Sequence, residues 1–256
     1  MKHIIKLSLI SLILCLLCAL TLTSCEDVKE SEGLYMEHYE DLNGYAVLGI
    51  GSCKDTEIVI PSEYNGKPVV AILSSAFYQN QTITSVTLPE SIRSIGQWAF
   101  AYCKNLVKIV LPEGVKTIDD YAFLECEKLE NITLPDSVTE IGRNVFDFTA
   151  LFLDEASWQN GTFYIGKHLI DTDPNIESCI IKDDTLTIAS EAFFNHHRLT
   201  SVTIPQSVIS IGTSVFGGCP SLAEIRCVAD GKPESWHADW NSGIKEGTQI
   251  IWGYTE

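Results

Sequence analysis

Basic residues are scarce in this sequence. It has 17 lysines and arginines against 34 aspartates and glutamates, which gives a formal net charge of −17 at pH 7. Binding to nucleic acid requires a basic patch that neutralises phosphates, and electrostatic adhesion to an anionic lipid surface requires positive charge as well. We therefore expect neither kind of partner. The acidity itself is ordinary in a protein that must remain soluble.

The familiar catalytic and cofactor-binding motifs are also missing. The sequence contains no G-x-S-x-G, no H-E-x-x-H, no phosphate-binding loop and no dinucleotide fingerprint. We therefore expect no enzymatic activity, no catalytic residues and no cofactor.

Metal-ligating patterns are equally weak. Cys53, Cys179 and Cys227 are scattered without ligand-like spacing. The pair His196-His197 is predicted to lie in a surface loop, because adjacent residues do not share a face of a regular element. Asp171-x-Asp173 lacks the full spacing of a calcium-binding loop. We therefore predict no metal site.

One long apolar run is present, at Leu7–Leu22. It follows a basic start and is too short for a comfortable membrane span, so residues 1–24 are predicted to be an export signal. The run ends in Leu22-Thr23-Ser24-Cys25, which looks like a bacterial lipobox. We therefore predict that Cys25 is lipidated and that residues 25–34 hold the anchor and a charged tether. An ordinary cleaved signal with an incidental cysteine is the alternative.

A repeat of 23 residues dominates the rest of the chain. Leu106–Cys126 reads LVKIVLPEGVKTIDDYAFLEC, and neighbouring segments repeat this pattern with substitutions. The same phenylalanine recurs at this spacing, as Phe77, Phe100, Phe123 and Phe146, and then as Phe193 and Phe216. A fixed period of this length means one supersecondary unit stacked on itself, which predicts a solenoid.

Each unit can be written in physical terms from the copy at Leu106–Cys126. Ile109 and Leu111 share one face of a short strand that ends at Pro112. The chain then returns with Val115, Ile118, Ala122 and Phe123 pointing inward, so that stacked coils form ladders of apolar side chains. Gly96, Gly142 and Gly212 recur at one bend, where we predict a left-handed residue. Cys103, Cys126 and Cys219 share another position, where we predict buried free thiols.

The sequence suggests the following layout for a single domain. Residues 35–57 form an N-terminal hairpin cap, and 58–227 hold about six repeat units. The spacing from Phe146 to Phe193 is 47 residues, which predicts an inserted hairpin near 158–173. Residues 228–256 form a Trp-rich C-terminal cap that contains Trp236 and Trp240. An aromatic platform that stacks sugars is the alternative for these tryptophans.

The repeat resembles the BspA-like class of leucine-rich repeats. The resemblance extends over residues 35–256. Within each repeat it rests on I/L-P at the end of the strand, I-G at the bend and A-F-x-x-C at the end of the unit. Outside the regular repeats it rests on Y-N-G-K-P-V, F-Y-I-G-K-H-L-I and a final W-x-x-x-W-N. The resemblance implies a β-rich leucine-rich-repeat solenoid and a bacterial surface or secreted protein, with adhesion implied for some members.

The outward side of the stacked strands is the surface that we predict to bind a ligand. Alternate strand positions there are small and polar, with little charge, which suits recognition by shape and hydrogen bonds; a plain solvated sheet is the alternative. The candidate ligand-binding residues are Ser85, Thr87, Lys108, Val110, Asn131, Thr133, Ser201 and Thr203.

We therefore expect a binding protein of the cell envelope, lipid-anchored and facing outward. Its partners would be an extracellular protein or glycan and, through the anchor, the membrane. An envelope scaffold without a soluble ligand and a sugar-capture lipoprotein that uses Trp236 and Trp240 are the alternatives.

Overall fold

The structure is a computed structural model and describes residues 29–255. The predicted export signal and Cys25 lie outside the described residues, as does residue 256. Ser31–Glu256 forms one compact unit. Within the described part of the chain, no helix is long and apolar enough to cross a membrane.

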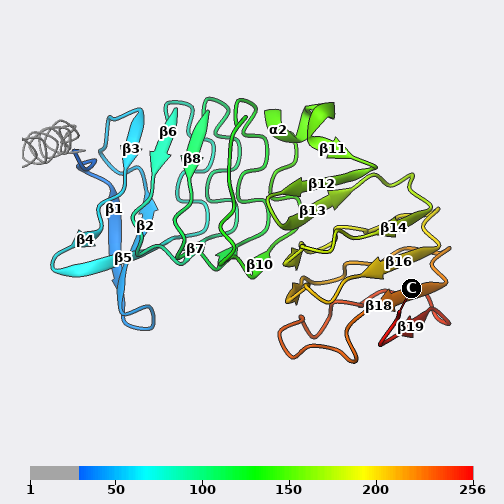
Figure 1. Cartoon of the computed structure of the whole chain (residues 1–256). Helices are drawn as coiled ribbons and strands as arrows, with labels where there is room; N and C mark the ends of the chain where they lie inside the picture. The colour runs from blue at the N-terminus through cyan, green and yellow to red at the C-terminus, as the bar shows by residue number, and fades with distance from the viewer. Residues whose placement is uncertain (1–28, 256) are drawn as a thin grey trace, which may run out of the picture. The chain divides into compact units, whose positions relative to one another are not determined.

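The described residues form a β-solenoid of about nine turns with a spacing of roughly 23 residues, which confirms the predicted fold class (Figure 1). Neighbouring turns pair as parallel strands, and the pairing of Ile95 with Ile118 shows that one turn of the solenoid equals one repeat of the sequence.

Two rows of strands build the N-terminal part. One sheet runs in the order β1 (Tyr35–Tyr39), β2 (Gly44–Gly49), β5 (Lys67–Ile72), β7 (Ser94–Ile95), β9 (Thr117–Ile118) and β10 (Glu140–Ile141), with β4 (Glu63–Tyr64) paired to β5. The other contains β3 (Glu57–Val59), β6 (Ser85–Thr87) and β8 (Lys108–Val110), and a single bridge from Lys108 to Asn131 continues it. In the repeated coils, the sequence predicts strands only for the second row, because β7, β9 and β10 of the first row are two residues long.

An insertion then interrupts both rows. It contains the short helix α2 (Ala150–Leu153), the 3-10 turn η1 (Glu155–Ser157) and the strands β11 (Trp158–Gln159), β12 (Thr162–Ile165) and β13 (His168–Thr172). The predicted turn forms, with Ile165 paired to His168. Strand β13 then pairs in parallel with β15, so the insertion takes the place of a regular coil.

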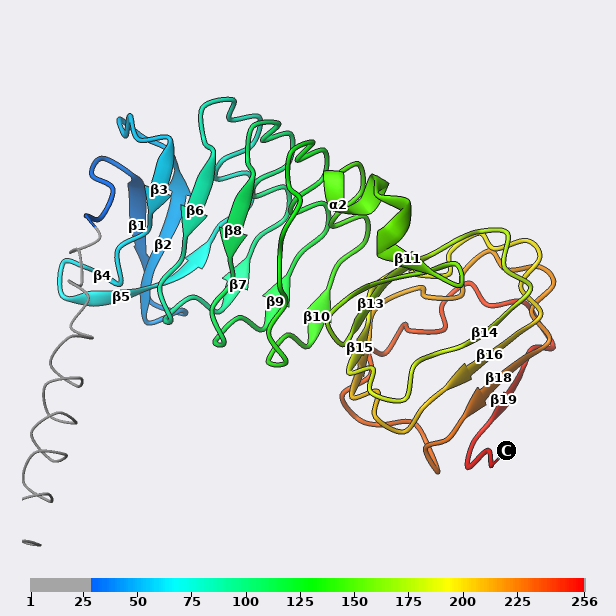
Figure 2. The same ribbon diagram turned by 45° about the horizontal axis from the view of Figure 1, so that its top comes forward.

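Two further rows of strands follow the insertion. The first continues from β13 through β15 (Thr187–Ile188) to β17 (Ser210–Ile211), and the second runs β14 (Ser178–Ile180), β16 (Ser201–Ile204), β18 (Glu224–Cys227) and β19 (Gln249–Ile251). Figure 2 shows this second row as a group separate from β3, β6 and β8. The strand rows before and after the insertion therefore belong to different sheets.

Stacked phenylalanines form the centre of the core, as predicted. The ring centroids of Phe77 and Phe100 are 5.1 Å apart, those of Phe100 and Phe123 5.4 Å, and those of Phe123 and Phe146 5.5 Å. Their planes lie within 10° of one another. Phe193 and Phe216 repeat the contact beyond the insertion at 5.2 Å.

The predicted cysteine ladder is also confirmed. The six cysteines within the described residues are free and buried. The thiols of Cys103, Cys126 and Cys219 each donate a hydrogen bond to the carbonyl of the phenylalanine 26 residues earlier, at 3.0, 3.1 and 2.9 Å. Burial raises the pKa of Cys103 to about 12, so the thiol has a structural role and is poorly reactive.

The surface position predicted for His196 is wrong. His196 occupies the same repeat position as the cysteines and is 3% exposed. Its Nε2 lies 2.9 Å from the hydroxyl of Thr172, and its Nδ1 lies 3.1 Å from the carbonyl oxygen of Phe194. The imidazole fills the space that a thiol fills elsewhere because Thr172 offers it a polar partner. His197 is exposed, as predicted.

The left-handed position was also assigned to the wrong residues. Gly96, Gly142 and Gly212 do not have positive φ. Glycine is required there because the previous coil passes very close: a Cβ on Gly142 would lie 2.3 Å from the backbone nitrogen of Asp120. The left-handed residues instead lie two positions before and two positions after the ladder phenylalanine. They include Ser75, Trp98, Tyr121, Asn144, Glu191 and Ser214 before it, and Gln79, Tyr102, Glu125, Phe148 and Asn195 after it.

Candidate binding surfaces

Four of the predicted ligand-binding residues lie in the β3–β6–β8 sheet; Asn131 joins it through one bridge, and Thr133 follows two residues later. Ser85, Lys108 and Asn131 lie side by side in register, and Thr87 pairs with Val110. Thr87, Lys108, Val110, Asn131 and Thr133 are exposed, and Ser85 is half-buried. We call Ser85, Thr87, Lys108, Val110, Asn131 and Thr133 the strand face.

Ser201 and Thr203 do not extend the strand face. Both lie on β16, in the sheet beyond the insertion. Thr203 is only 8% exposed, and its neighbours in register are Ile180 and Arg226, which are larger and flank it on both sides. The expectation that Thr203 presents an outward contact is therefore wrong, and the predicted face is divided in two.

Two tryptophans of the C-terminal segment, Trp236 and Trp240, are buried. Trp236 and Trp240 are each 2% exposed and lie 5.2 Å apart, centroid to centroid. The indole N–H of Trp236 donates to the carbonyl of Val208 at 3.1 Å. Both rings belong to the core cluster beyond the insertion, so they cover the end of that core and offer no stacking platform to a sugar.

Beside the phenylalanine ladder, a cluster of aromatic rings lies at the corner of the coils. The sequence did not predict this cluster. We call Tyr78, Trp98, Tyr102 and Tyr121 the aromatic corner. Trp98 stacks on Tyr121 with centroids 4.3 Å apart. Tyr78 is perpendicular to both Trp98 and Tyr102, at interplanar angles of 86° and 82°. Tyr78 is 43% exposed, and the other three rings are partly exposed.

The backbone of the aromatic corner is strained. Trp98, Tyr102 and Tyr121 have φ values of 59°, 62° and 60°, a region that costs roughly 1–2 kcal/mol for a residue with a bulky side chain. Other coils hold Asn144 or Asn195 at the equivalent positions, and asparagine tolerates this conformation better. The large rings at these positions are therefore not required by the coil.

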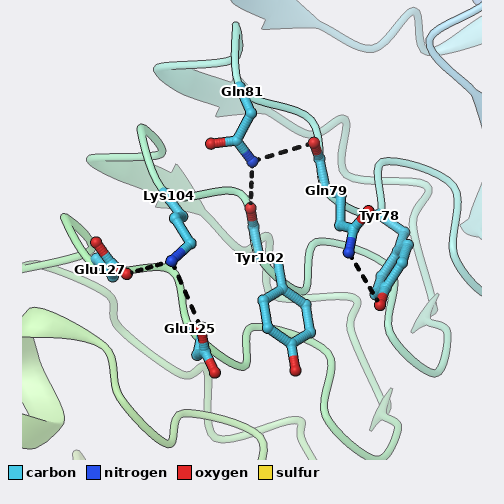
Figure 3. Close-up of polar contacts among 7 residues, drawn as sticks. All are labelled: Tyr78, Gln79, Gln81, Tyr102, Lys104, Glu125 and Glu127. Atoms are coloured by element: carbon cyan, nitrogen blue, oxygen red, sulfur yellow. Dashed lines mark hydrogen bonds and ion pairs between the residues drawn. The ribbon is translucent and has the colours of Figure 1, made fainter.

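Polar groups surround the aromatic corner (Figure 3). The side-chain amide of Gln81 donates to the carbonyl oxygens of Gln79 and Tyr102, at 3.1 and 2.7 Å. The ammonium of Lys104 lies 2.6 Å from a carboxylate oxygen of Glu127 and 3.7 Å from one of Glu125. The hydrogen bond to Glu127 raises the pKa of Lys104. Two carboxylates therefore share one ammonium beside Tyr102.

Arg143 lies against the other end of the aromatic corner. Its guanidinium carbon is 5.3 Å from the centroid of Tyr121. Its nitrogens lie 3.0 Å from a carboxylate oxygen of Glu191 and 3.4 Å from one of Asp120. The hydrogen bond to Glu191 raises the pKa of Arg143. At this end of the aromatic corner, the guanidinium of Arg143 therefore contacts both an aromatic face and two carboxylates.

A polar groove of about 460 Å³ runs along the bends of the other strand row. Its lining includes Asp119, Asp120 and Glu140 together with small hydroxyl side chains. Burial, with the charges of Asp120 and Glu140, raises the pKa of Asp119. Among residues 29–255, no group of three His, Cys, Asp or Glu side chains could hold a metal ion.

Part of the signal for the aromatic corner is visible in the sequence. Trp98 and Tyr121 are 23 residues apart and therefore lie at one repeat position. The contribution of Tyr78 and Tyr102 is not visible, because these two residues occupy different positions in their coils. The positive φ values of Trp98, Tyr102 and Tyr121 had no signal either, since none of these three residues is glycine or asparagine.

The comparisons identify the family. The profile of the BspA type leucine rich repeat region matches residues 51–170 and 163–232, in six copies. The chain therefore belongs to the BspA type leucine-rich-repeat family. Proteins of this repeat family are typically binding scaffolds, and membership indicates that class here.

One solved structure supports the same fold, and two others are similar to this chain. A leucine-rich repeat protein of T. pallidum is 29% identical, with 77% of this chain and 81% of that chain covered and a TM-score of 0.51. A leucine-rich repeat protein from Bacteroides ovatus is 23% identical, covering 81% and 48% of the two chains with a TM-score of 0.46. One from Bacteroides capillosus is 31% identical over 48% of this chain and 92% of that chain, with a TM-score of 0.42. No curated protein matches.

Proposed function

We propose that this chain is a lipid-anchored, outward-facing binding protein of the cell envelope. It recognises an extracellular protein or glycan, and it serves adhesion to host or neighbouring cells. The anchor is Cys25, and the solenoid presents the binding surfaces. The family to which the chain belongs supports a binding role.

The observation that carries the proposal is the aromatic corner. Its rings are exposed or partly exposed to solvent. Three of them occupy left-handed positions that most other coils fill with polar residues, with Phe148 as an exception. A strained backbone conformation is retained mostly at functional sites, where the side chain has a role beyond maintaining the fold. Exposed aromatic clusters commonly mark binding surfaces. The strand face supplies a second, polar surface.

Burial of the C-terminal tryptophans argues against a sugar-capture site at Trp236 and Trp240. Replacing either indole would open the core, so a loss of sugar binding in such variants would not identify a site. An envelope scaffold without a soluble ligand is the remaining alternative to adhesion.

Attachment to the membrane is tested with Cys25→Ser in cells that produce the full chain. We expect the wild type to fractionate with membranes and the variant to appear in the soluble fraction, because the acyl chains supply the attachment. Protease treatment of intact cells then reports whether the solenoid faces outward. A variant that remains with the membranes would show that the anchor assignment is wrong.

Adhesion is tested by binding of the full chain to immobilised matrix proteins and glycans. Val110→Glu and Thr133→Glu place a charge on the strand face without touching the core, since both side chains are exposed. Loss of binding in both would locate the ligand on the strand face. Loss in Trp98→Asn alone would locate it at the aromatic corner. Absence of binding to every ligand and to whole cells would favour the scaffold alternative.

A further inference from the structure

We propose that the aromatic corner docks a basic segment of a partner protein, with arginine or lysine side chains held against Tyr78, Trp98 and Tyr102 beside Glu125 and Glu127. This inference rests on the proposed binding function and names the chemistry of its ligand. It depends on the ring geometry, on the local charge and on the way Arg143 is held in the same cluster.

The ring geometry fits a compact cation better than a flat sugar. Tyr78 and Tyr102 meet at 82° with centroids 5.6 Å apart, and Tyr78 meets Trp98 at 86° and 6.1 Å. The planes of Trp98 and Tyr102 differ by only 4°. Rings at right angles form two walls of a box, which is how aromatic cages surround ammonium and guanidinium groups.

A stacking platform for a pyranose ring requires a free aromatic face. One face of Trp98 is covered by Tyr121, whose centroid is 4.3 Å away, and Tyr121 in turn carries the guanidinium of Arg143. Tyr78, which is exposed, and Tyr102, which is partly exposed, are perpendicular and cannot offer one continuous plane. The geometry therefore disfavours a glycan at this corner.

The charge beside the rings is negative. Glu125 and Glu127 share the single ammonium of Lys104, which leaves one negative charge uncompensated within that group of three. The whole chain carries a net charge of −17, so a basic partner is attracted over a distance and an acidic one is repelled. Charge complementarity thus selects a basic segment as the occupant.

Arg143 provides an intramolecular example of the proposed contact. It lies over the ring of Tyr121 and pairs with Asp120 and Glu191, so a guanidinium, an aromatic face and two carboxylates already meet at this corner. Tyr102 presents the same combination one coil earlier, with Glu125 and the Lys104–Glu127 pair on one side and Tyr78 on the other (Figure 3). A partner arginine there would make equivalent contacts.

The test uses variants that preserve the fold. Trp98→Asn and Tyr102→Asn copy Asn144 and Asn195, which occupy the equivalent left-handed positions in other coils. Phe148→Asn is the matched control, because Phe148 has φ of 58° at the same repeat position as Tyr102 but lies outside the aromatic corner. Circular dichroism confirms that each variant is folded.

The probes are fluorescent peptides of about twelve residues that alternate serine with arginine, lysine, glutamine or glutamate, together with neutral oligosaccharides. We expect the full chain to bind the arginine peptide saturably and the glutamate peptide not at all. The Trp98→Asn/Tyr102→Asn double variant should bind at least about tenfold more weakly, and Phe148→Asn should bind like the wild type. Glu125→Gln/Glu127→Gln should weaken binding and reduce its dependence on salt.

Each outcome has a distinct meaning. Equal binding of the arginine peptide by the double variant and the wild type would overturn the inference. Binding of oligosaccharides that the double variant loses would overturn the ligand class and keep the surface-binding function. Adhesion to cells that persists in the double variant, without peptide binding, would also overturn the inference but leave the proposed function standing. Absence of both adhesion and peptide binding would overturn both.

Discussion

Replacing Phe123 with alanine tests the inside and the outside of the solenoid most directly. Phe123 is completely buried and stacks between Phe100 and Phe146, at centroid distances of 5.4 and 5.5 Å. Removing a buried phenylalanine costs about 3–5 kcal/mol of unfolding free energy. Each lost aromatic pair contributes roughly 0.5–1.5 kcal/mol within that cost.

The site cannot collapse to refill the space. The backbone N–H of Phe123 donates to the carbonyl of Val145 at 2.9 Å, and that of Phe100 donates to the carbonyl of Ala122 at 2.8 Å. These bonds hold neighbouring coils at a fixed spacing, so the cavity remains and the upper half of the range applies. In a domain of this size the loss corresponds to a melting temperature lower by roughly 8–20 °C.

Thermal unfolding followed by circular dichroism at several scan rates measures the effect. Lys108→Ala is the control, because Lys108 is exposed on β8 and its truncation should leave the melting temperature within about 1–2 °C of the wild type. Equal shifts in the two variants would refute the assignment of the phenylalanine ladder to the core. The coil that contains Phe123 and the coils on either side of it should lose protection from hydrogen exchange first, since each coil contacts only its neighbours.

Three further predictions concern the close approach of coils and two buried ionisable groups. Gly142→Ala should lower the unfolding free energy by about 1–3 kcal/mol in urea, because the added Cβ would meet the backbone of Asp120 at 2.3 Å; Gly231→Ala, with open space around it, should not. Burial raises the pKa of Asp171 to about 7, so stability should fall as the pH rises from about 4 through 7, and Asp171→Asn should flatten this slope. Burial lowers the pKa of His168 from 6.5, so stability should fall as the pH drops below about 6.5, and His168→Gln should remove that dependence. Unchanged pH profiles in these two variants would contradict the burial argument.

The core of the fold was predictable because its signal is periodic. A ladder phenylalanine that recurs every 23 residues, with a proline just after the strands β3, β6, β8 and β16, leaves few alternatives to a stacked coil. The buried thiols followed from the same register, since Cys103 and Cys126 occupy one repeat position. The insertion was visible as an irregular spacing between Phe146 and Phe193.

The bends were harder to predict. Glycine at position 142 suggested positive φ, whereas the structure requires glycine there for close backbone approach. The left-handed positions hold residues such as Trp98 and Glu125, which local propensity disfavours in that conformation. Hydrogen bonds to the adjacent coil maintain these conformations: the N–H of Trp98 donates to the carbonyl of Asp120 at 3.1 Å. Such contacts between coils are not encoded in any single repeat.

The candidate binding residues were also only partly predictable from the sequence. Alternation along β6 and β8 correctly placed Thr87 and Val110 outside, because strand side chains point to opposite faces in turn. Thr203 obeys the same alternation but is covered by its neighbours Ile180 and Arg226, which come from adjacent coils. Exposure depends on what lies beside a residue, and alternation within one strand carries no information about that.

The sequence by itself therefore determined the repeat, the inward ladders and the family, because each depends on spacing along one chain. The tertiary structure alone decided which surfaces are continuous. Insertion of β11, β12 and β13 divided the strand face, and stacking of successive coils gathered Tyr78, Trp98, Tyr102 and Tyr121 into one corner. The physical reason is that a coil fixes its own inside and outside, while the composition of a surface is fixed by the packing between coils.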